Sequence, residues 1–331
     1  MKIEYIRPGN NKNLSQIREL LALTGLNWDE NVEVTVTISE DYELCATGSR
    51  QENVIKCVAV SPQYEGEGLI ATIITELLKD AHADGFSHIF LFTKPQNMDV
   101  FGGLGFYPVA ATPGTVLMEN RRNGIADYVS ALKQPGAVIP IGAVVANCNP
   151  FTNGHRYLIE TASRQCGLVY LFILSEDRSE FSAETRLILA EECVRDLKNV
   201  AVRQTGDYLV SFATFPDYFI KDKAQAKQIN YELDLTIFAE NFAKPLGITR
   251  RYVGSEPSCT VTAGYNEKMR TILPAHGIEV VEIPRCAYGE TIVSASAVRS
   301  FLAQGDLDEV RKLVPRAVYQ YLEKVTKNER Q

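Results

Sequence analysis

From about residue 137 onward, short apolar runs alternate with segments whose apolar residues recur at helical spacing. Residues 168–174 (Leu-Val-Tyr-Leu-Phe-Ile-Leu) are continuously apolar, which is typical of a strand covered on both faces. This alternation predicts a Rossmann-like, doubly wound α/β domain with a parallel sheet, whose ligands bind at the carboxyl ends of the strands. The expected strands cover residues 138–146, 168–174, 200–203, 251–254 and 278–283; the expected helices cover 154–165, 182–196, 223–241 and 266–276, two short segments after 296 and 306, and a last one from 316.

The first 120 residues show a different pattern. Residues 32–38 alternate in side-chain character, as a half-buried strand does, and residues 43–48 and 54–60 predict two further strands. A glycine-bearing loop leads into an apolar-periodic helix over residues 69–83, and a strand is expected at 88–93. We therefore expect a separate α+β domain over residues 1–120, a linker over 121–136 and the doubly wound domain over 137–331.

An anion site is predicted where the first strand of the second domain gives way to a helix. The apolar run ends at Asn147, an Asn-Pro turn follows at Asn149, and a helix is expected to begin beside Gly154 and His155. The first N–H groups of a helix lack intrahelical partners and lie at the positive end of its dipole, so this junction suits a phosphate. His155 adds a donor that can become cationic.

Two further segments follow strands of the same sheet and should meet at the same edge. Ser294, Ser296 and Arg299 come after the last strand and open a helix, so hydroxyls, backbone N–H groups and a guanidinium again face one anion. Residues 175–177 follow the second strand, with Arg186 nearby, and could hold a different part of the substrate.

A second glycine loop lies in the N-terminal domain. Gln63, Gly66 and Gly68 stand between a strand and a helix, where glycines let backbone N–H groups approach a phosphate. The residues also permit a simpler interpretation, in which the glycines only serve a tight turn. With the strand order and the Phe-x-x-Leu-Gly-Phe of residues 101–106, this part resembles the GNAT acetyltransferase family. In that family a Q/R-x-x-G-x-G/A loop binds the pyrophosphate of coenzyme A, which implies a CoA-like ligand here.

Composition narrows the class of protein. The 331 residues carry a formal net charge of −7, which argues against a general nucleic-acid or anionic-membrane binder. The N-terminus lacks the basic and apolar regions of a signal peptide, so a cytoplasmic location is expected. The seven cysteines are scattered and form no C-x-x-C pair, which predicts reduced thiols. Because the chain also has only four histidines, we expect no metal site built from its side chains.

Two motifs of the second domain carry a resemblance. Asn-Pro-Phe-Thr-Asn-Gly-His, ending at His155, is similar to the (H/T)-x-G-H motif of the nucleotidyltransferase superfamily, and Ser-Ala-Ser-Ala-Val-Arg, ending at Arg299, is similar to its I-S-S-T-x-x-R motif. Thr152 replaces the first histidine, a variant that the superfamily also uses.

A GNAT-like module in front of such a domain resembles the citrate lyase ligase family, and the resemblance covers nearly the whole chain. It implies a cytoplasmic ligase that uses ATP and Mg²⁺ to convert acetate to acetyl-adenylate. The acetyl group then passes to the dephospho-CoA-derived thiol on the acyl carrier subunit of citrate lyase, and AMP and pyrophosphate are released.

The resemblance also implies roles for particular residues. His155 and Thr152 would contact the ATP phosphates, and Arg299 the leaving pyrophosphate; these three are the predicted catalytic residues. Cys148 beside the strand is expected to be inert packing rather than an acyl acceptor. The predicted ATP-binding residues are Asn149, Phe151, Thr152, Gly154, His155, Lys221, Gly254, Glu256, Ser294, Ser296 and Arg299, and those for the CoA-like group are Gln63, Gly66 and Gly68.

Two other functions fit parts of this pattern. A simple nucleotidyltransferase, of the pantetheine-phosphate or nicotinamide-mononucleotide kind with an accessory acyl-CoA-binding domain, would use a phosphorylated acceptor and ignore acetate. A non-catalytic sensor of ATP and an acyl-CoA is the other possibility, but it would not need the transition-state contacts that the two motifs provide.

Overall fold

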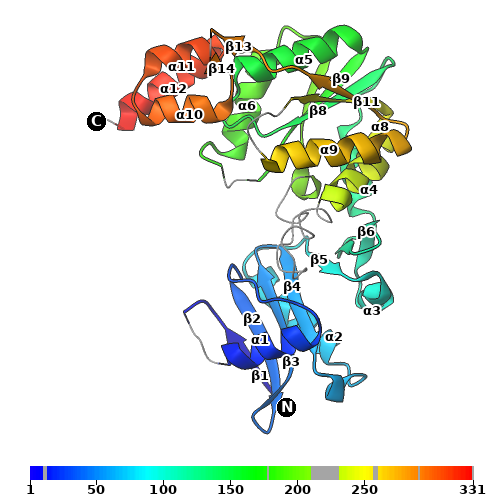
Figure 1. Cartoon of the computed structure of the whole chain (residues 1–331). Coiled ribbons are helices and arrows are strands. Elements are labelled where there is room, and N and C mark those ends of the chain that lie inside the picture. The colour runs from blue at the N-terminus through cyan, green and yellow to red at the C-terminus, as the bar shows by residue number, and fades with distance from the viewer. Residues whose placement is uncertain (10–12, 177–178, 210–230, 256–259, 290, 330–331) are drawn as a thin grey trace. The chain divides into compact units, whose positions relative to one another are not determined.

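The computed structural model describes residues 1–9, 13–176, 179–209, 231–255, 260–289 and 291–329. The chain forms two compact units (Figure 1). Unit 1 comprises Met1–Asp127 with Phe212–Ile237, and unit 2 comprises Tyr128–Ser211 with Phe238–Gln331. The division falls inside helix α4 (Gly124–Leu132). The predicted Lys221 and Glu256 lie outside the described residues.

Unit 1 is built on a seven-stranded mixed sheet of order β1-β2-β3-β4-β5-β7-β6. Helix α2 packs on β2, β3 and β4, and its apolar face enters a core with Val36, Ile55 and Leu91. The helices are α1 (Leu14–Leu23), α2 (Leu69–Ala83) and α3 (Met98–Gly102), with short 3-10 turns at Pro62–Tyr64 and Pro95–Asn97. The strands are β1 (Lys2–Ile6), β2 (Val34–Glu40), β3 (Glu43–Gln51), β4 (Val54–Val60), β5 (Phe90–Thr93), β6 (Tyr107–Ala111) and β7 (Val116–Glu119).

Strands β4 and β5 form the parallel pair of this sheet, and they pair only at their beginnings. Val54 is opposite Phe90 and Ile55 is opposite Leu91, and no pairing follows along the rest of these two strands. At Cys57 the backbone of β4 has a φ of +54°, an unusual value for a residue with a side chain. The backbone of β4 beyond this point is therefore not paired with β5, and it faces a cleft.

Unit 2 contains a five-stranded parallel sheet of order β10-β9-β8-β11-β12. The strand order reverses between β8 and β11, and ligands of doubly wound sheets bind outside the carboxyl ends of the strands at such a switch point. The strands are β8 (Ile141–Ala146), β9 (Leu168–Ile173), β10 (Val200–Gln204), β11 (Ile248–Gly254) and β12 (Glu279–Ile283), with a small hairpin of β13 (Ala287–Tyr288) and β14 (Thr291–Ile292).

Helices cover both faces of this sheet. On β9, Val169, Leu171 and Ile173 enter one core, whereas Tyr170 and Phe172 stack on each other on the opposite face. This two-sided burial explains the continuous apolar run of β9. The helices are α5 (Asn153–Gln165), α6 (Ala183–Val194), α8 (Lys244–Leu246), α9 (Thr260–Ala275), α10 (Ala295–Ala303), α11 (Leu307–Leu313) and α12 (Arg316–Glu329), with a 3-10 turn at Gly206–Tyr208 and a π-helix at Phe238–Ala243.

The predicted fold class, an α+β domain followed by a doubly wound parallel sheet, is confirmed. The first strand of unit 2 begins three residues later than predicted, because Val138 and Ile139 are 62% and 77% exposed and precede the sheet. The helix expected over residues 223–241 is described only from Tyr231 and passes into the π-helix. β1, α1 and the β6–β7 hairpin were not predicted.

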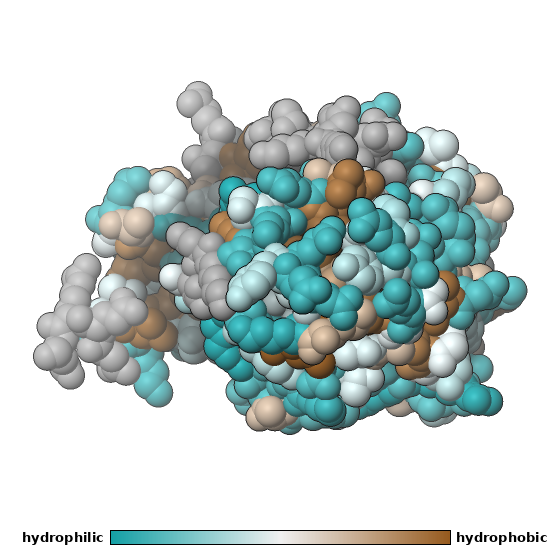
Figure 2. All heavy atoms as spheres, turned by 90° about the horizontal axis from the view of Figure 1, so that it is seen from below, coloured by the Kyte–Doolittle hydropathy of each residue, from teal (hydrophilic) through white to brown (hydrophobic). Residues whose placement is uncertain are grey.

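The surface of the chain is mainly hydrophilic on the face that Figure 2 shows, where apolar residues gather only in small patches. Large exposed apolar side chains are scattered, and they include Leu23 and Tyr42 in unit 1. Among the helices that the structure describes, none has the length and apolar character needed to cross a membrane.

Candidate active site

The junction between β8 and α5 holds His155 in one orientation. Thr152 is the N-cap of α5, and its hydroxyl accepts a hydrogen bond from the His155 backbone N–H at 3.3 Å. In return, the backbone N–H of Thr152 donates to Nδ1 of His155 at 3.0 Å. This reciprocal pair satisfies two donors at the start of the helix, so the threonine and the histidine form a capping box.

This contact determines which ring nitrogen of the neutral imidazole carries the proton. Because Nδ1 accepts a hydrogen bond, the neutral ring carries its proton on Nε2, which is then the available donor. Burial, reinforced by the positive charge of Arg285, lowers the pKa of His155 to about 4. The ring is therefore a neutral hydrogen-bond donor near pH 7. It is not the cation that the sequence analysis allowed at this position.

Gly154 brings the two sequence motifs together. A Cβ atom at this position would lie 3.1 Å from the backbone carbonyl oxygen of Val293 and 3.4 Å from the Thr152 hydroxyl. Val293 immediately precedes Ser294, whose hydroxyl caps α10 by accepting the N–H of Ala297 at 3.1 Å. A glycine is needed here because the first turn of α5 approaches the segment before α10 closely.

Arg299 connects the two motifs directly. One of its Nη atoms donates to the backbone carbonyl of Asn149, and the other lies 3.4 Å from the Ser296 hydroxyl. Its Nε lies 3.7 Å from a carboxylate oxygen of Glu180. The structure thus brings Asn149, Ser296 and Arg299 together, although the arginine and the asparagine are 150 residues apart in sequence.

Arg186 has a different place from the one that the sequence suggested. It is fully buried, and its guanidinium donates to the backbone carbonyls of Asn147 at 3.0 Å, Leu174 at 2.8 Å and Phe181 at 3.0 Å. The side chain therefore holds the ends of β8 and β9 together and faces the protein instead of a substrate. The idea that it contacts part of the substrate is wrong, and its role is to position the loop that carries Asn149.

Two other residues of the loop after β8 are also buried. The side chain of Phe151 is fully buried, and its ring packs on the His155 ring with 5.5 Å between centroids. It supports the imidazole from the core, so only its backbone remains for a nucleotide. Cys148 is buried with a φ of +52°, and burial raises the pKa of its thiol, which agrees with inert packing.

The carboxyl ends of β11 and β12 form the other side of the switch point. Gly254 ends β11, and a Cβ atom there would meet nothing within 4 Å, so a ligand can approach its backbone. The buried Asn266 side chain donates to the Gly254 carbonyl at 3.2 Å. Arg285 follows β12, and its Nε donates to the carbonyl of Ser255 at 2.7 Å. The sequence analysis did not single out Arg285, because it belongs to neither motif.

Unit 1 contains a cleft of about 740 Å³ where β4 and β5 diverge. It is lined by Val58 and Val60 of β4, by Phe92 of β5, and by Gly66 and Gly68 at the start of α2. The two glycines have φ values of +88° and +75°, and neither would bring a Cβ within 4 Å of another atom. Gln63 is exposed and is not among the residues that line the cleft.

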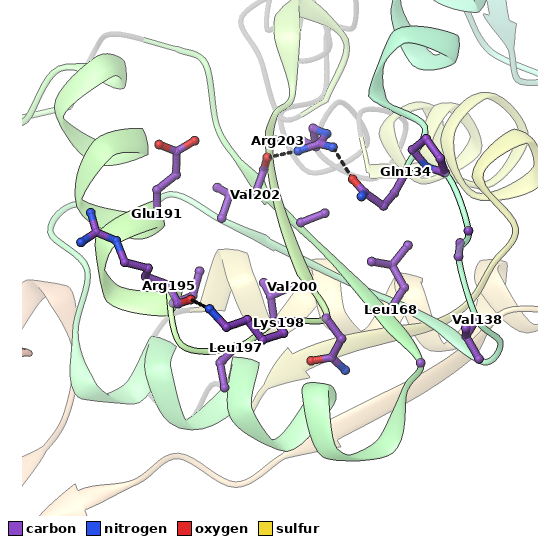
Figure 3. A pocket seen from close by; sticks show the side chains of 17 residues that line it. Gln134, Val138, Leu168, Glu191, Arg195, Leu197, Lys198, Val200, Val202 and Arg203 are labelled. Carbon is purple, nitrogen blue, oxygen red and sulfur yellow. Dashed lines mark hydrogen bonds between the residues drawn. The ribbon is translucent and has the colours of Figure 1, made fainter.

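Another pocket, of about 550 Å³, lies at the opposite edge of the unit 2 sheet (Figure 3). Leu168 and Val200, the first residues of β9 and β10, line it together with Val138, which precedes β8. Arg203 donates to the Gln134 side chain at 2.9 Å across its wall. This pocket is at the amino ends of the strands and is therefore separate from the site built by Thr152, His155 and Arg299.

The fold and the site define a class of protein, a nucleotidyltransferase-like domain preceded by a GNAT-type domain. The family model of the citrate lyase ligase C-terminal domain matches residues 141–322, and that of the acetyltransferase (GNAT) family matches residues 20–106.

Relatives match over almost the whole chain. The chain is 41% identical to the citrate (pro-3S)-lyase ligase of Escherichia coli, over 98% of this chain and 95% of that protein. It is 40% identical to that of Klebsiella pneumoniae, over 92% and 91%. A phosphopantetheine adenylyltransferase of Streptococcus agalactiae is 32% identical over only 33% of this chain and 70% of that protein. The chain belongs to the citrate lyase ligase family and is an ATP-dependent ligase.

Proposed function

We propose that the chain activates acetate with ATP and transfers the acetyl group to the thiol of the prosthetic group on the acyl carrier subunit of citrate lyase, which activates that enzyme. The observation that supports this most strongly is the contact between the two motifs. The Thr152–His155 turn and the Arg299 helix meet at the switch point of a doubly wound sheet, in a chain that matches citrate lyase ligases over nearly its whole length.

In the first step a carboxylate oxygen of acetate attacks the α-phosphorus of ATP, and pyrophosphate leaves. Negative charge moves onto the phosphate oxygens, so fixed donors lower the barrier. His155 would donate from Nε2 to the α-phosphate, and the Thr152 turn would add backbone donors. Arg299, Ser294 and Ser296 at the start of α10 would hold the leaving pyrophosphate.

The nucleoside would lie along the ends of β8 and β11. Gly254 leaves open space beside its backbone, which suits a flat base or ribose. Gly154 would contact the ligand through its backbone. Asn149 would contact it through its side-chain NH2 group, because its Oδ1 accepts the N–H of Phe181 at 3.1 Å and its carbonyl accepts from Arg299. The predicted contacts of Lys221 and Glu256 remain expectations.

Magnesium would arrive with the nucleotide. Among the described residues, no group of three or more His, Cys, Asp or Glu side chains could hold a metal ion. Mg²⁺ commonly binds through substrate phosphates with few protein ligands, so we assign it to the substrate as MgATP. Glu180, 3.7 Å from Arg299, is the nearby carboxylate that could contact the ion or its waters.

In the second step the carrier thiol loses its proton to solvent and its sulfur attacks the acetyl carbon of acetyl-adenylate, and AMP leaves with the former acetate oxygen. The cleft of unit 1 would bind the dephospho-CoA-like part of the prosthetic group, with its phosphates at the N–H groups near Gly66 and Gly68. A cytoplasmic location fits the free thiols of Cys45, Cys57, Cys148, Cys166, Cys193 and Cys286.

An ATP–pyrophosphate exchange assay tests this function. The purified chain should exchange labelled pyrophosphate into ATP only when acetate is present. Exchange that ignores acetate and requires a phosphorylated acceptor such as phosphopantetheine would replace the proposal with a simple nucleotidyltransferase. Binding of ATP without exchange under any condition would indicate a sensor.

A further inference from the structure

Arg285 is held at the carboxyl ends of two neighbouring strands. Its backbone N–H donates to the Ser255 hydroxyl at 3.2 Å, and its Nε donates to the Ser255 carbonyl at 2.7 Å. The N–H of Ser255 donates in turn to the carbonyl of Ile283 at 2.9 Å, which joins the ends of β11 and β12. The guanidinium is thus positioned by contacts at the edge where ligands of this fold bind.

The chain beside Arg285 leads through close contacts to the His155 turn. The carbonyl of Cys286 accepts the N–H of Val293 at 3.1 Å, and the carbonyl of Val293 is the group that Gly154 approaches. Gly154 immediately precedes His155. The positive charge of Arg285 also contributes to the low pKa of His155, so the two groups lie within electrostatic reach of each other.

We propose that Arg285 binds the carboxylate of the acid substrate beside the α-phosphate, so that Arg285 determines how strongly the acid binds. This inference rests on the proposed function. Displacement at phosphorus places the attacking and leaving oxygens roughly in line, so the acid and the pyrophosphate need cations in different places. Arg299 lies on α10 near two serine hydroxyls, whereas Arg285 lies two residues after the end of β12.

The chemistry of the guanidinium fits this role. Its planar donors match the two oxygens of a carboxylate. In the step that it assists, one carboxylate oxygen forms a bond to the α-phosphorus. The bond from that phosphorus to the bridging oxygen breaks, and its electron pair leaves with pyrophosphate. No proton transfer is needed, because acetate is already ionised.

The test is a pair of substitutions, Arg285→Gln and Arg285→Lys, in the full chain. In the exchange assay, Arg285→Gln should raise the KM for acetate about 10- to 100-fold, the effect of losing one charge-assisted pair, and leave the KM for ATP within about twofold. Arg285→Lys keeps the positive charge but lacks the planar pair of donors, so it should raise the KM for acetate less than Arg285→Gln does. Arg270→Gln, which removes an exposed arginine paired with Glu282, is the matched control and should change neither constant.

A second measurement separates a local role from a loss of fold. The chain has four histidines, so the imidazole of His155 can be followed by NMR and identified with the His155→Ala variant. Arg285→Gln should raise the pKa of His155, because a positive charge has been removed. Acetate affinity that is unchanged in both variants, or a KM for ATP that rises as much as that for acetate, would overturn the inference. Wild-type chain without acetate-dependent exchange would instead overturn the proposed function.

Discussion

Each unit has a strand, a glycine-bearing loop and a helix, but the two junctions are built in opposite ways. In unit 1, α2 follows Gly68 without a side-chain cap, and Gly66 and Gly68 both have positive φ values. In unit 2, α5 follows Thr152, whose side chain caps the helix and whose backbone N–H holds His155. Gly66 and Gly68 leave the first junction open towards a cleft, whereas Gly154 allows close packing at the second.

This difference matches two kinds of task. Around Gly66 and Gly68 no atom lies within 4 Å of a Cβ position, so backbone donors remain accessible to a ligand that needs only to be bound. At the second junction the first turn of α5 packs closely against Val293, and the capping box holds the His155 ring, so the donors of this turn are fixed before any substrate arrives. Transition-state stabilisation needs such preorganised donors. We therefore expect changes at the second junction to affect turnover and changes at the first to affect binding.

The largest effect is expected for His155→Ala. Exchange should fall roughly 10²- to 10³-fold, which is the usual cost of removing one transition-state donor. The variant also loses the acceptor of the capping box, so its stability should fall by about 1 kcal/mol. Exchange kinetics and thermal unfolding measure the two effects. His276→Ala, which changes an exposed histidine, is the control, and wild-type exchange by His155→Ala would remove His155 from the mechanism.

A smaller effect on the same step is expected for Gly154→Ala. The new methyl group would stand 3.1 Å from the Val293 carbonyl, so the start of α10 must shift by a few tenths of an ångström. Displacing groups that act on the transition state should lower exchange roughly 10-fold. Gly102→Ala, at a glycine that has open space for a Cβ atom and no positive φ, is a control for the loss of a glycine. Unchanged exchange would show that the close approach of the two motifs is not required.

The matching change in unit 1 is Gly66→Val. The loop would be strained at a φ of +88°, and the side chain would enter the cleft, so the apparent KM for the carrier should rise about fivefold or more. Acetate-dependent exchange should stay at the wild-type level, because adenylate formation uses only unit 2. Steady-state acetylation of the carrier and exchange are measured side by side. A loss of exchange with an unaltered KM for the carrier would contradict the division of tasks.

The remaining prediction concerns the pH dependence of stability instead of activity. The pKa of His155 is lowered from 6.5 to about 4 by burial and by Arg285, so between these values the unfolded chain binds a proton that the folded chain excludes. The contribution of the neutral His155 to stability is complete above pH 6.5 and is lost as the pH falls towards 4, with a slope of up to about 1.4 kcal/mol per pH unit. Denaturant unfolding of wild type and His155→Gln should show a shallower decline for the variant. Parallel curves would mean that His155 is not held neutral.

Sequence alone predicted the elements whose local pattern agrees with their burial. The helix expected over residues 69–83 is observed as Leu69–Ala83, because its apolar spacing is regular and a glycine precedes it. Strand β1 could not be found in this way, since it lies at the edge of the sheet and none of its five positions is buried. The strand depends on its pairing with β2, a contact that no local pattern reveals.

The candidate site shows the same limit. Thr152, Gly154 and His155 could be placed from sequence, because their geometry arises within one turn of helix. Arg186 and Arg285 could not, because their surroundings come from chain segments that only the fold brings together. From sequence alone, an arginine could equally bind a ligand, lie on the surface or donate to buried carbonyls. Only the groups that contact it in the folded chain distinguish these cases.

The most direct test of the central claim follows oxygen from acetate to AMP. If the chain forms acetyl-adenylate and passes the acetyl group to the carrier thiol, acetate labelled with ¹⁸O at both carboxylate oxygens should leave one ¹⁸O in the phosphate of AMP after a single turnover. Mass spectrometry of the released AMP measures this transfer. AMP without ¹⁸O, formed while the carrier becomes acetylated, would contradict the account, because the acetyl group would then have reached the thiol by another route.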